Sequence, residues 1–210
     1  MPPDEKGILL LELSLQRSTN AGLDIDIQSH DTLDDTRSFV NVIAPILKPT
    51  SQRWRSLIAH GSWDFTSMLF SGGGWSFQGI IHLDISFSGR KYTSAEPDAI
   101  TTAFRDTPNL VRLSVEALPN DAALDIHWGS LVFYECRQSN LSILRHLSAI
   151  ETLIIDDGMS DNWSVTFGDL KKIAPIYLPS LHSLAVNSSF CPSMLSDLSD
   201  CLPSAACVSI

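Results

Sequence analysis

A short pattern of apolar residues recurs along the chain and constrains its fold more than any other feature. In "PNLVRLSVEA", Leu110, Leu113 and Val115 stand at intervals of three and then two residues. The interval of two is typical of a strand, in which alternate side chains face the same side, and the interval of three before it indicates a bend leading into that strand. The full set of such triplets is Trp54, Leu57 and Ala59; Ile80, Leu83 and Ile85; Leu110, Leu113 and Val115; Trp128, Leu131 and Phe133; Ile150, Leu153 and Ile155; Leu181, Leu184 and Val186.

Two weaker copies flank this set. Val208 and Ile210 end the chain with the strand part of the pattern, and "LDIDI" at Leu23–Ile27 has the strand alternation without the bend residue. The central residues of successive copies lie about 18 to 31 residues apart, which scatters around the 20 to 29 residues of leucine-rich repeats. An ordinary α/β protein is the alternative, but its buried strands usually read as continuous apolar runs without a shared offset.

Sequence with helical character lies between most of the strand copies. These stretches are "DDTRSFVNVIAPILKP" from Asp34, "EPDAITTAFRDTP" from Glu96, "NLSILRHLS" from Asn140, "FGDLKKIAPIYLP" from Phe167 and "CPSMLSDLSDCLP" from Cys191. A single helix and strand cannot cover their own apolar face, whereas stacking several such pairs builds a shared core and a parallel sheet. We therefore predict an α/β fold: a leucine-rich-repeat solenoid with a curved parallel sheet, outer helices and irregular repeats.

Composition sets the domain organisation and excludes some classes of partner. With 210 residues and 44% hydrophobic content, the chain can form one continuous array, which we place at residues 8–210 after a disordered N-terminus of residues 1–7. A net charge of -10 and only 14 scattered Lys and Arg residues argue against nucleic-acid binding. The N-terminus carries Asp4 and Glu5 rather than a basic start, and no apolar run approaches the ~18 residues of a membrane span. We expect no membrane association and a cytoplasmic or nuclear location.

Motifs for catalysis or cofactor binding do not stand out. The four cysteines and six histidines lack zinc-ligand spacing, so we interpret the cysteines as reduced thiols that pack as small apolar groups and expect no metal site. Gly72, Gly73 and Gly74 are not followed by the lysine of a phosphate loop, which favours a surface loop. We expect no cofactor, no catalytic residues and no enzymatic activity; the alternative is an α/β enzyme whose site is not recognisable in the sequence.

The predicted phase of the strands also names a binding surface. Residues between the inward-facing apolar positions should point to the exposed concave side of the sheet, where a protein partner or substrate would bind. Arg112 and Tyr134 are of the types most often found as binding hot spots. The predicted protein-binding residues are Ile58, His60, Asp84, Arg112, Ser114, Glu116, Val132, Tyr134, Ile154, Asp156 and Asn187.

The phrases "TSQRWRSLIAHG", "TPNLVRLSVE", "IHWGSLVFYECRQSNLSILRHLSAIETLIID" and "LPSLHSLAVNSSF" carry a family resemblance. Over roughly residues 8–190 the chain resembles the leucine-rich-repeat region of F-box-type proteins of mushroom-forming (basidiomycete) fungi. In that family the repeats present substrates, and an N-terminal F-box module docks onto the adaptor of a cullin-type ubiquitin ligase. The resemblance implies a non-enzymatic protein-interaction scaffold, the substrate-recognition part of an F-box-like ubiquitin-ligase receptor.

The F-box module itself is not apparent. Only Met1 to Gly7 precede the first repeat, and the last strand copy lacks a polar capping unit, so we expect an array truncated at both ends. An adaptor would then bind only if an F-box exists upstream. The alternatives are a leucine-rich-repeat protein without a role in ubiquitin transfer and a truncated gene product.

Overall fold

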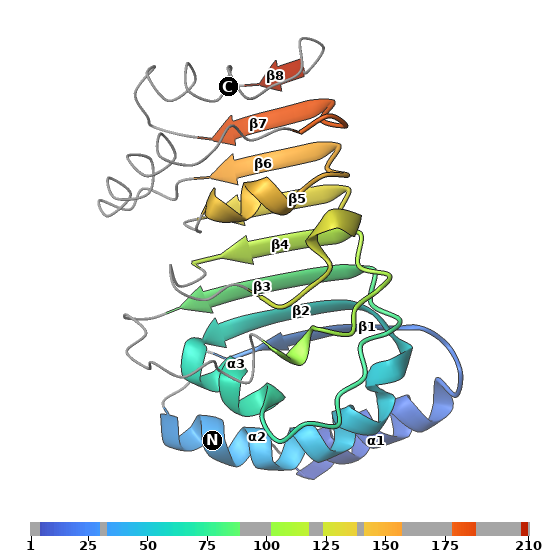
Figure 1. Cartoon of the computed structure of the whole chain (residues 1–210). Helices are drawn as coiled ribbons and strands as arrows, with labels where there is room; N and C mark the ends of the chain where they lie inside the picture. Colours follow the sequence, from blue (N-terminus) through green and yellow to red (C-terminus); the bar gives the residue numbers. More distant parts are fainter. Residues whose placement is uncertain are drawn as a thin grey trace. The chain divides into compact units, whose positions relative to one another are not determined.

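The computed structural model shows an α/β protein whose strands all pair in parallel where their pairing is described. The structure describes residues 5–29, 33–88, 102–117, 124–137, 141–156, 178–187 and 207–209. The chain divides into two compact units, which we call the N-terminal unit (residues 1–109 and 124–126) and the C-terminal unit (residues 110–123 and 127–210). Each unit contains its own run of parallel strands (Figure 1).

In the N-terminal unit, helices alternate with strands along the chain. Its elements are α1 (Glu5–Arg17), β1 (Leu23–Gln28), α2 (Leu33–Leu47), the 3-10 helix η1 (Lys48–Arg53), β2 (Trp54–Ser62), α3 (Trp63–Phe70) and β3 (His82–Ser88). β2 pairs in parallel with β1 on one side and with β3 on the other. Ser62 ends β2 and caps α3, because its hydroxyl accepts a hydrogen bond of 3.1 Å from the amide of Phe65.

Aromatic side chains fill much of the core of the N-terminal unit. Trp54 is fully buried at the start of β2, and its ring lies 5.6 Å from that of Phe77. Phe77 in turn stacks on Phe104 at 4.9 Å, and Phe70 packs edge-on against both. Phe77 follows the glycine run Gly72–Gly74, whose positive φ angles and exposure confirm the predicted surface loop. This loop returns the chain to the core at Phe77.

The C-terminal unit repeats a simpler element. Its strands are β4 (Arg112–Glu116), β5 (Phe133–Arg137), β6 (Thr152–Asp156), β7 (Ser183–Asn187) and β8 (Cys207–Ser209), with 3-10 helices η2 (Trp128–Ser130) and η3 (Leu141–His146) between them. The strands follow one another in chain order, and every neighbouring pair is parallel. Leu113, Tyr134, Leu153, Leu184 and Val208 form one continuous row across the register.

The bend before the strand recurs with the same hydrogen bonds in both units. The amides of Ile80, Leu131, Ile150 and Leu181 each donate to the carbonyl three residues earlier. In the C-terminal unit, the carbonyls of Val111, Val132 and Glu151 each accept two successive amides from the following copy. Neighbouring copies are thus joined by equivalent backbone contacts, as expected of a structural repeat.

These contacts correct the predicted phase of one copy. We expected Leu131 and Phe133 to point inward and Tyr134 outward, but Leu131 is the bend residue, and Tyr134 and Cys136 are the buried strand residues. The pattern Leu131, Tyr134, Cys136 has the same three-and-two spacing as Leu110, Leu113, Val115. The predicted triplet Trp128, Leu131 and Phe133 was wrong because it starts one bend too early: Leu131 corresponds to Leu110, not to Leu113.

The other predicted elements met different outcomes. The strand at Leu23–Ile27 and the helix after Asp34 are confirmed as β1 and α2, whereas the stretch from Asn140 folds as the short η3. The helical stretches expected from Phe167 and Cys191 lie outside the described residues. α3 was not predicted, nor was α1, which includes Glu5–Gly7 of the expected disordered terminus. None of the helices within the described ranges has the length and apolar character needed to traverse a bilayer.

Candidate protein-binding face

The strands present one row of partly exposed side chains for each row of buried ones. We call the set of these outward-pointing strand residues the open face, and treat it separately in each unit. In the N-terminal unit it comprises Asp24, Asp26, Gln28, Ser56, Ile58, His60, His82, Asp84 and Ser86. In the C-terminal unit it comprises Arg112, Ser114, Glu116, Phe133, Glu135, Arg137, Thr152, Ile154, Asp156, Ser183 and Ala185.

Two side-chain pairs that each contain a histidine lie on the open face of the N-terminal unit: one joins a serine to a histidine, and the other joins a histidine to an aspartate. The hydroxyl of Ser56 lies 3.2 Å from Nδ1 of His82, and Nε2 of His60 lies 3.3 Å from Oδ1 of Asp84. The two histidines belong to different pairs, so the histidine that contacts the serine is not the one that contacts the carboxylate. A Ser-His-Asp relay needs one histidine to link both groups, and these contacts do not provide it.

Arg137 organises the charges on the open face of the C-terminal unit. Its guanidinium donates to Oε1 of Glu135 through Nη2 at 2.6 Å and through Nε at 2.9 Å, and Nη1 lies 3.9 Å from Glu116. The hydrogen bond to Glu135 raises the pKa of Arg137, with smaller contributions from the charges of Glu116 and Asp156. Glu135 also accepts a hydrogen bond of 3.4 Å from Ser114. These contacts join the middle and the carboxyl-terminal ends of β4 and β5 into one polar network.

An arginine stacked on a phenylalanine, which we call the Arg112–Phe133 platform, lies at the amino-terminal ends of the same two strands. The guanidinium carbon of Arg112 lies 4.5 Å from the ring centre of Phe133, which is its register partner on β5. Stacking of this kind contributes ~0.5–1 kcal/mol at exposed sites and holds both side chains in place. Across the register, Ser114 and Glu135 give way to Ile154 and Ala185, so the middle row of the face changes from polar to apolar between β5 and β7, with Thr152 and Asp156 on either side of Ile154.

Most of the predicted binding residues lie on the open face of one unit or the other. Ile58, His60 and Asp84 lie half-buried in the N-terminal unit; Arg112, Ser114, Glu116, Ile154 and Asp156 lie half-buried or exposed in the C-terminal unit. Val132 is half-buried but precedes β5, and Asn187 ends β7 in register with Asp156.

Tyr134 is the predicted binding residue that the structure contradicts. Its side chain is fully buried in the row between Leu113 and Leu153, and its ring packs edge-on against Trp128 at 5.9 Å. The residues that take its predicted place on the open face are Phe133, Glu135 and Arg137. Aligning Leu131 with Leu110 rather than with Leu113 would have found them, because the shift of three residues restores the common spacing.

Two further features bear on the chemistry of the described residues: the thiol of Cys136 and the distribution of potential metal ligands. Cys136 is a free, buried thiol that donates to the carbonyl of Ile154 at 3.6 Å, in agreement with the packing role predicted from the sequence. Across the part of the chain that the structure describes, no three His, Cys, Asp or Glu side chains gather in a way that could hold a metal ion.

Comparison with known proteins adds no assignment. No family model matches the chain, and neither a curated protein nor a solved structure matches it.

Proposed function

We propose that the protein is a non-enzymatic protein-binding scaffold of the leucine-rich-repeat class, and that the open face of its C-terminal unit binds a protein partner. The observation that carries this proposal is the Arg112–Phe133 platform together with the apolar pair Ile154 and Ala185, which lies on the next two strands and two residues farther along them. Arginine and aromatic side chains dominate the energetics of many protein interfaces, and an apolar centre with a polar rim is their usual layout.

The fold supports this reading in two ways. The bend, the buried strand residues and the shared carbonyl contacts recur from copy to copy, as in repeat proteins that bind through a sheet surface. The polar groups of the face are also held in place before binding, because Arg137 is fixed by Glu135 and Arg112 by Phe133. A preorganised surface loses less conformational entropy when a partner binds.

The test is a comparison of partner retention between matched variants. Arg112→Ala with Phe133→Ala removes the platform without changing a buried strand residue, and Arg105→Ala removes an exposed arginine outside the strands. Proteins retained by the wild-type chain and by the Arg105 variant should be lost from the double variant when the three are compared by quantitative affinity purification. Equal retention by all three would refute binding through this face.

The proposed place in ubiquitin transfer is tested separately. The resemblance to F-box-type proteins suggests that the repeats select substrates for a cullin-type ligase. A gene product that carries an F-box upstream of this chain should co-purify the ligase adaptor, and the Arg112 and Phe133 substitutions should leave adaptor binding intact. Failure to retain the adaptor would leave a leucine-rich-repeat binding protein without a ubiquitin role.

A further inference from the structure

One side of helix α1 packs against the rest of the N-terminal unit, and the opposite side is apolar and exposed to solvent. Ile8, Leu11, Leu15 and Ser18 recur at helical spacing and are half-buried, and no residue of α1 is fully buried. On the other side, Leu9, Leu10 and Leu13 keep 56%, 64% and 37% of their surface exposed. Three leucines on the outside of one helix are a hydrophobic patch that association would cover.

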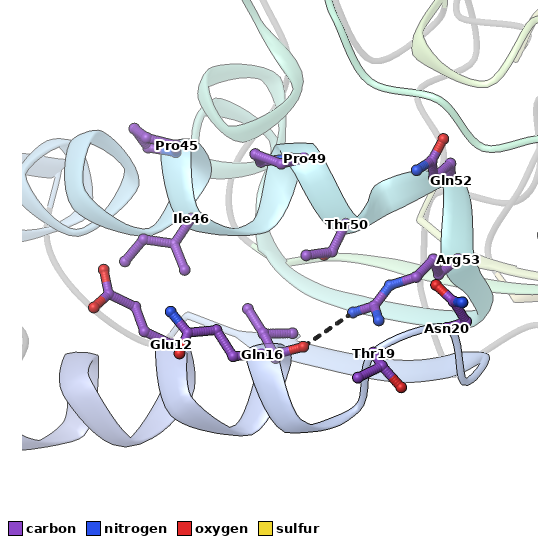
Figure 2. A pocket seen from close by; sticks show the side chains of 11 residues that line it. Glu12, Gln16, Thr19, Asn20, Pro45, Ile46, Pro49, Thr50, Gln52 and Arg53 are labelled. Atoms are coloured by element: carbon purple, nitrogen blue, oxygen red, sulfur yellow. Dashed lines mark hydrogen bonds between the residues drawn. The ribbon is translucent and has the colours of Figure 1, made fainter.

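The inner side of α1 contacts other residues of the N-terminal unit. Figure 2 shows the groove between α1 and the segment that joins α2 to β2, a cavity of about 770 Å³ with Glu12 and Gln16 on one wall and Pro49 and Thr50 on the other. Across it, Nη2 of Arg53 donates to the Ser18 hydroxyl at 3.1 Å and to the Leu15 carbonyl at 3.4 Å. These contacts orient α1 so that Leu9, Leu10 and Leu13 point away from the unit.

The outer side of α1 carries an acidic residue at one end and a basic residue at the other, so two copies of it are complementary in charge when they run in opposite directions. Glu5, Leu9, Leu13 and Arg17 follow one another every four residues, so they form a ridge along the helix. When two copies of this ridge lie antiparallel and cross at the level of Leu11 along the helix axis, Glu5 of each copy meets Arg17 of the other, and Leu9 meets Leu13. We propose that α1 pairs in this antiparallel way with α1 of a second copy of the chain.

Other arrangements of the two helices are less favourable. A parallel pair sets Glu5 against Glu5 and Arg17 against Arg17, which repel each other. An antiparallel pair shifted by one residue replaces the Leu9–Leu13 contacts with Leu10–Leu13 contacts but sets Lys6 against Arg17, which repel each other. The sequence of α1 therefore selects one orientation and one register.

The size of the patch sets the strength of the pairing. A helix of 13 residues is about 20 Å long, so the pair buries less than the ~1,200 Å² typical of stable interfaces. We expect self-association that is weak, depends on concentration and weakens further in high salt, because exposed ion pairs contribute to it. This association is independent of partner binding by the open face.

The experiment is sedimentation velocity of the full chain from low micromolar to submillimolar concentration. The wild-type chain should sediment faster as concentration rises, and Leu9→Ala with Leu13→Ala should abolish this increase. Glu5→Arg or Arg17→Glu alone should lower the association constant roughly tenfold, because symmetry places each substitution in two ion pairs. The combined Glu5→Arg and Arg17→Glu variant should restore association close to the wild-type level.

Gly7→Ala serves as the matched control. A Cβ atom at Gly7 meets no atom within 4 Å, so this change strengthens the helix without altering the ridge, and association should persist. A wild-type chain that stays monomeric throughout the concentration range would overturn the proposal and point to another occupant of the leucines. Association that the leucine substitutions abolish but the double charge reversal fails to restore would also overturn it, since the antiparallel register requires the rescue.

Discussion

Tyr134 on β5 stands in register with Leu153 on β6, and both side chains are buried in the same row. A tyrosine thus occupies a position that leucine holds in the neighbouring strands. Its hydroxyl is buried and has no hydrogen-bond partner among the residues that the structure describes. A buried hydroxyl without a partner costs free energy relative to the same group in water.

We predict that Tyr134→Phe stabilises the protein. The substitution keeps the ring and its edge-on contact with Trp128 while it removes the buried hydroxyl. The free energy of unfolding should rise by about 1 kcal/mol, measured by urea denaturation. A loss of similar size would show that the hydroxyl is hydrogen-bonded in solution.

Alkaline pH should destabilise the C-terminal unit through two buried acids. Burial raises the pKa of the Cys136 thiol above its ordinary value of 9.0, with smaller contributions from Glu135 and Asp156, and burial together with Cys136 raises the pKa of Tyr134 above 10.0. The unfolded chain then loses these protons at a lower pH than the folded chain does. Their contribution to stability is complete below about pH 9 and declines as the pH rises, by up to about 1.4 kcal/mol per pH unit for each group.

This dependence can be assigned by substitution. Urea denaturation from about pH 8 to about pH 11 should give a shallower decline for Cys136→Ala than for the wild-type chain, even if the variant is less stable at neutral pH. The comparison depends on slopes rather than on absolute stability. Parallel declines for the two proteins would mean that Cys136 ionises equally in both states.

Neighbouring residues on β6 should respond in opposite ways to the same substitution. Leu153 is buried, so Leu153→Asp places an unpaired charge in the core and should prevent cooperative folding, with a cost above about 4 kcal/mol. Ile154 lies half-buried on the open face, so Ile154→Asp should cost far less. Thermal melts followed by circular dichroism distinguish the two, and a cooperative melt for Leu153→Asp would refute the assigned strand phase.

Gly79 marks a close approach of two backbone segments in the N-terminal unit. A Cβ atom at this position would lie 2.9 Å from the carbonyl oxygen of Trp54 and 3.0 Å from that of Gln52. Since backbone atoms cannot move aside as a flexible side chain can, Gly79→Ala should destabilise the chain by about 1–3 kcal/mol. Chemical denaturation measures the loss, with Gly7→Ala as the control whose added methyl meets open space.

The repeated spacing predicted the strands well because it reflects which side chains are buried. Leu57, Leu83, Leu113, Leu153 and Leu184 are all buried strand residues, as expected. Tyr134 was misplaced because Leu131 and Phe133 were assigned as the inward strand residues, whereas Leu131 is the bend residue and the spacing from it places Tyr134 in the core. The Tyr134 side chain points inward because its position belongs to the buried row of Leu113 and Leu153.

The two unforeseen helices show where local patterns are insufficient. α1 contains the continuous run "ILLLEL", whose apolar residues occupy both sides of the helix, so no single stripe was visible. α3 begins directly after β2, and Ser62 serves both as the last strand residue and as the helix cap. The contacts of Arg137 depend on the register between β4 and β5, which becomes apparent only when the strands are paired.

The most direct test of the parallel register is methyl NOE spectroscopy of the C-terminal unit. The register pairs Leu153 with Leu184, Ile154 with Ala185 and Ile155 with Val186, and it places the middle pair on the opposite side of the sheet from the other two. Cross-peaks should therefore join Leu153 to Leu184 and Ile155 to Val186. Strong cross-peaks from Ile154 to Leu184 or Val186 in their place would contradict both the register and the open face derived from it.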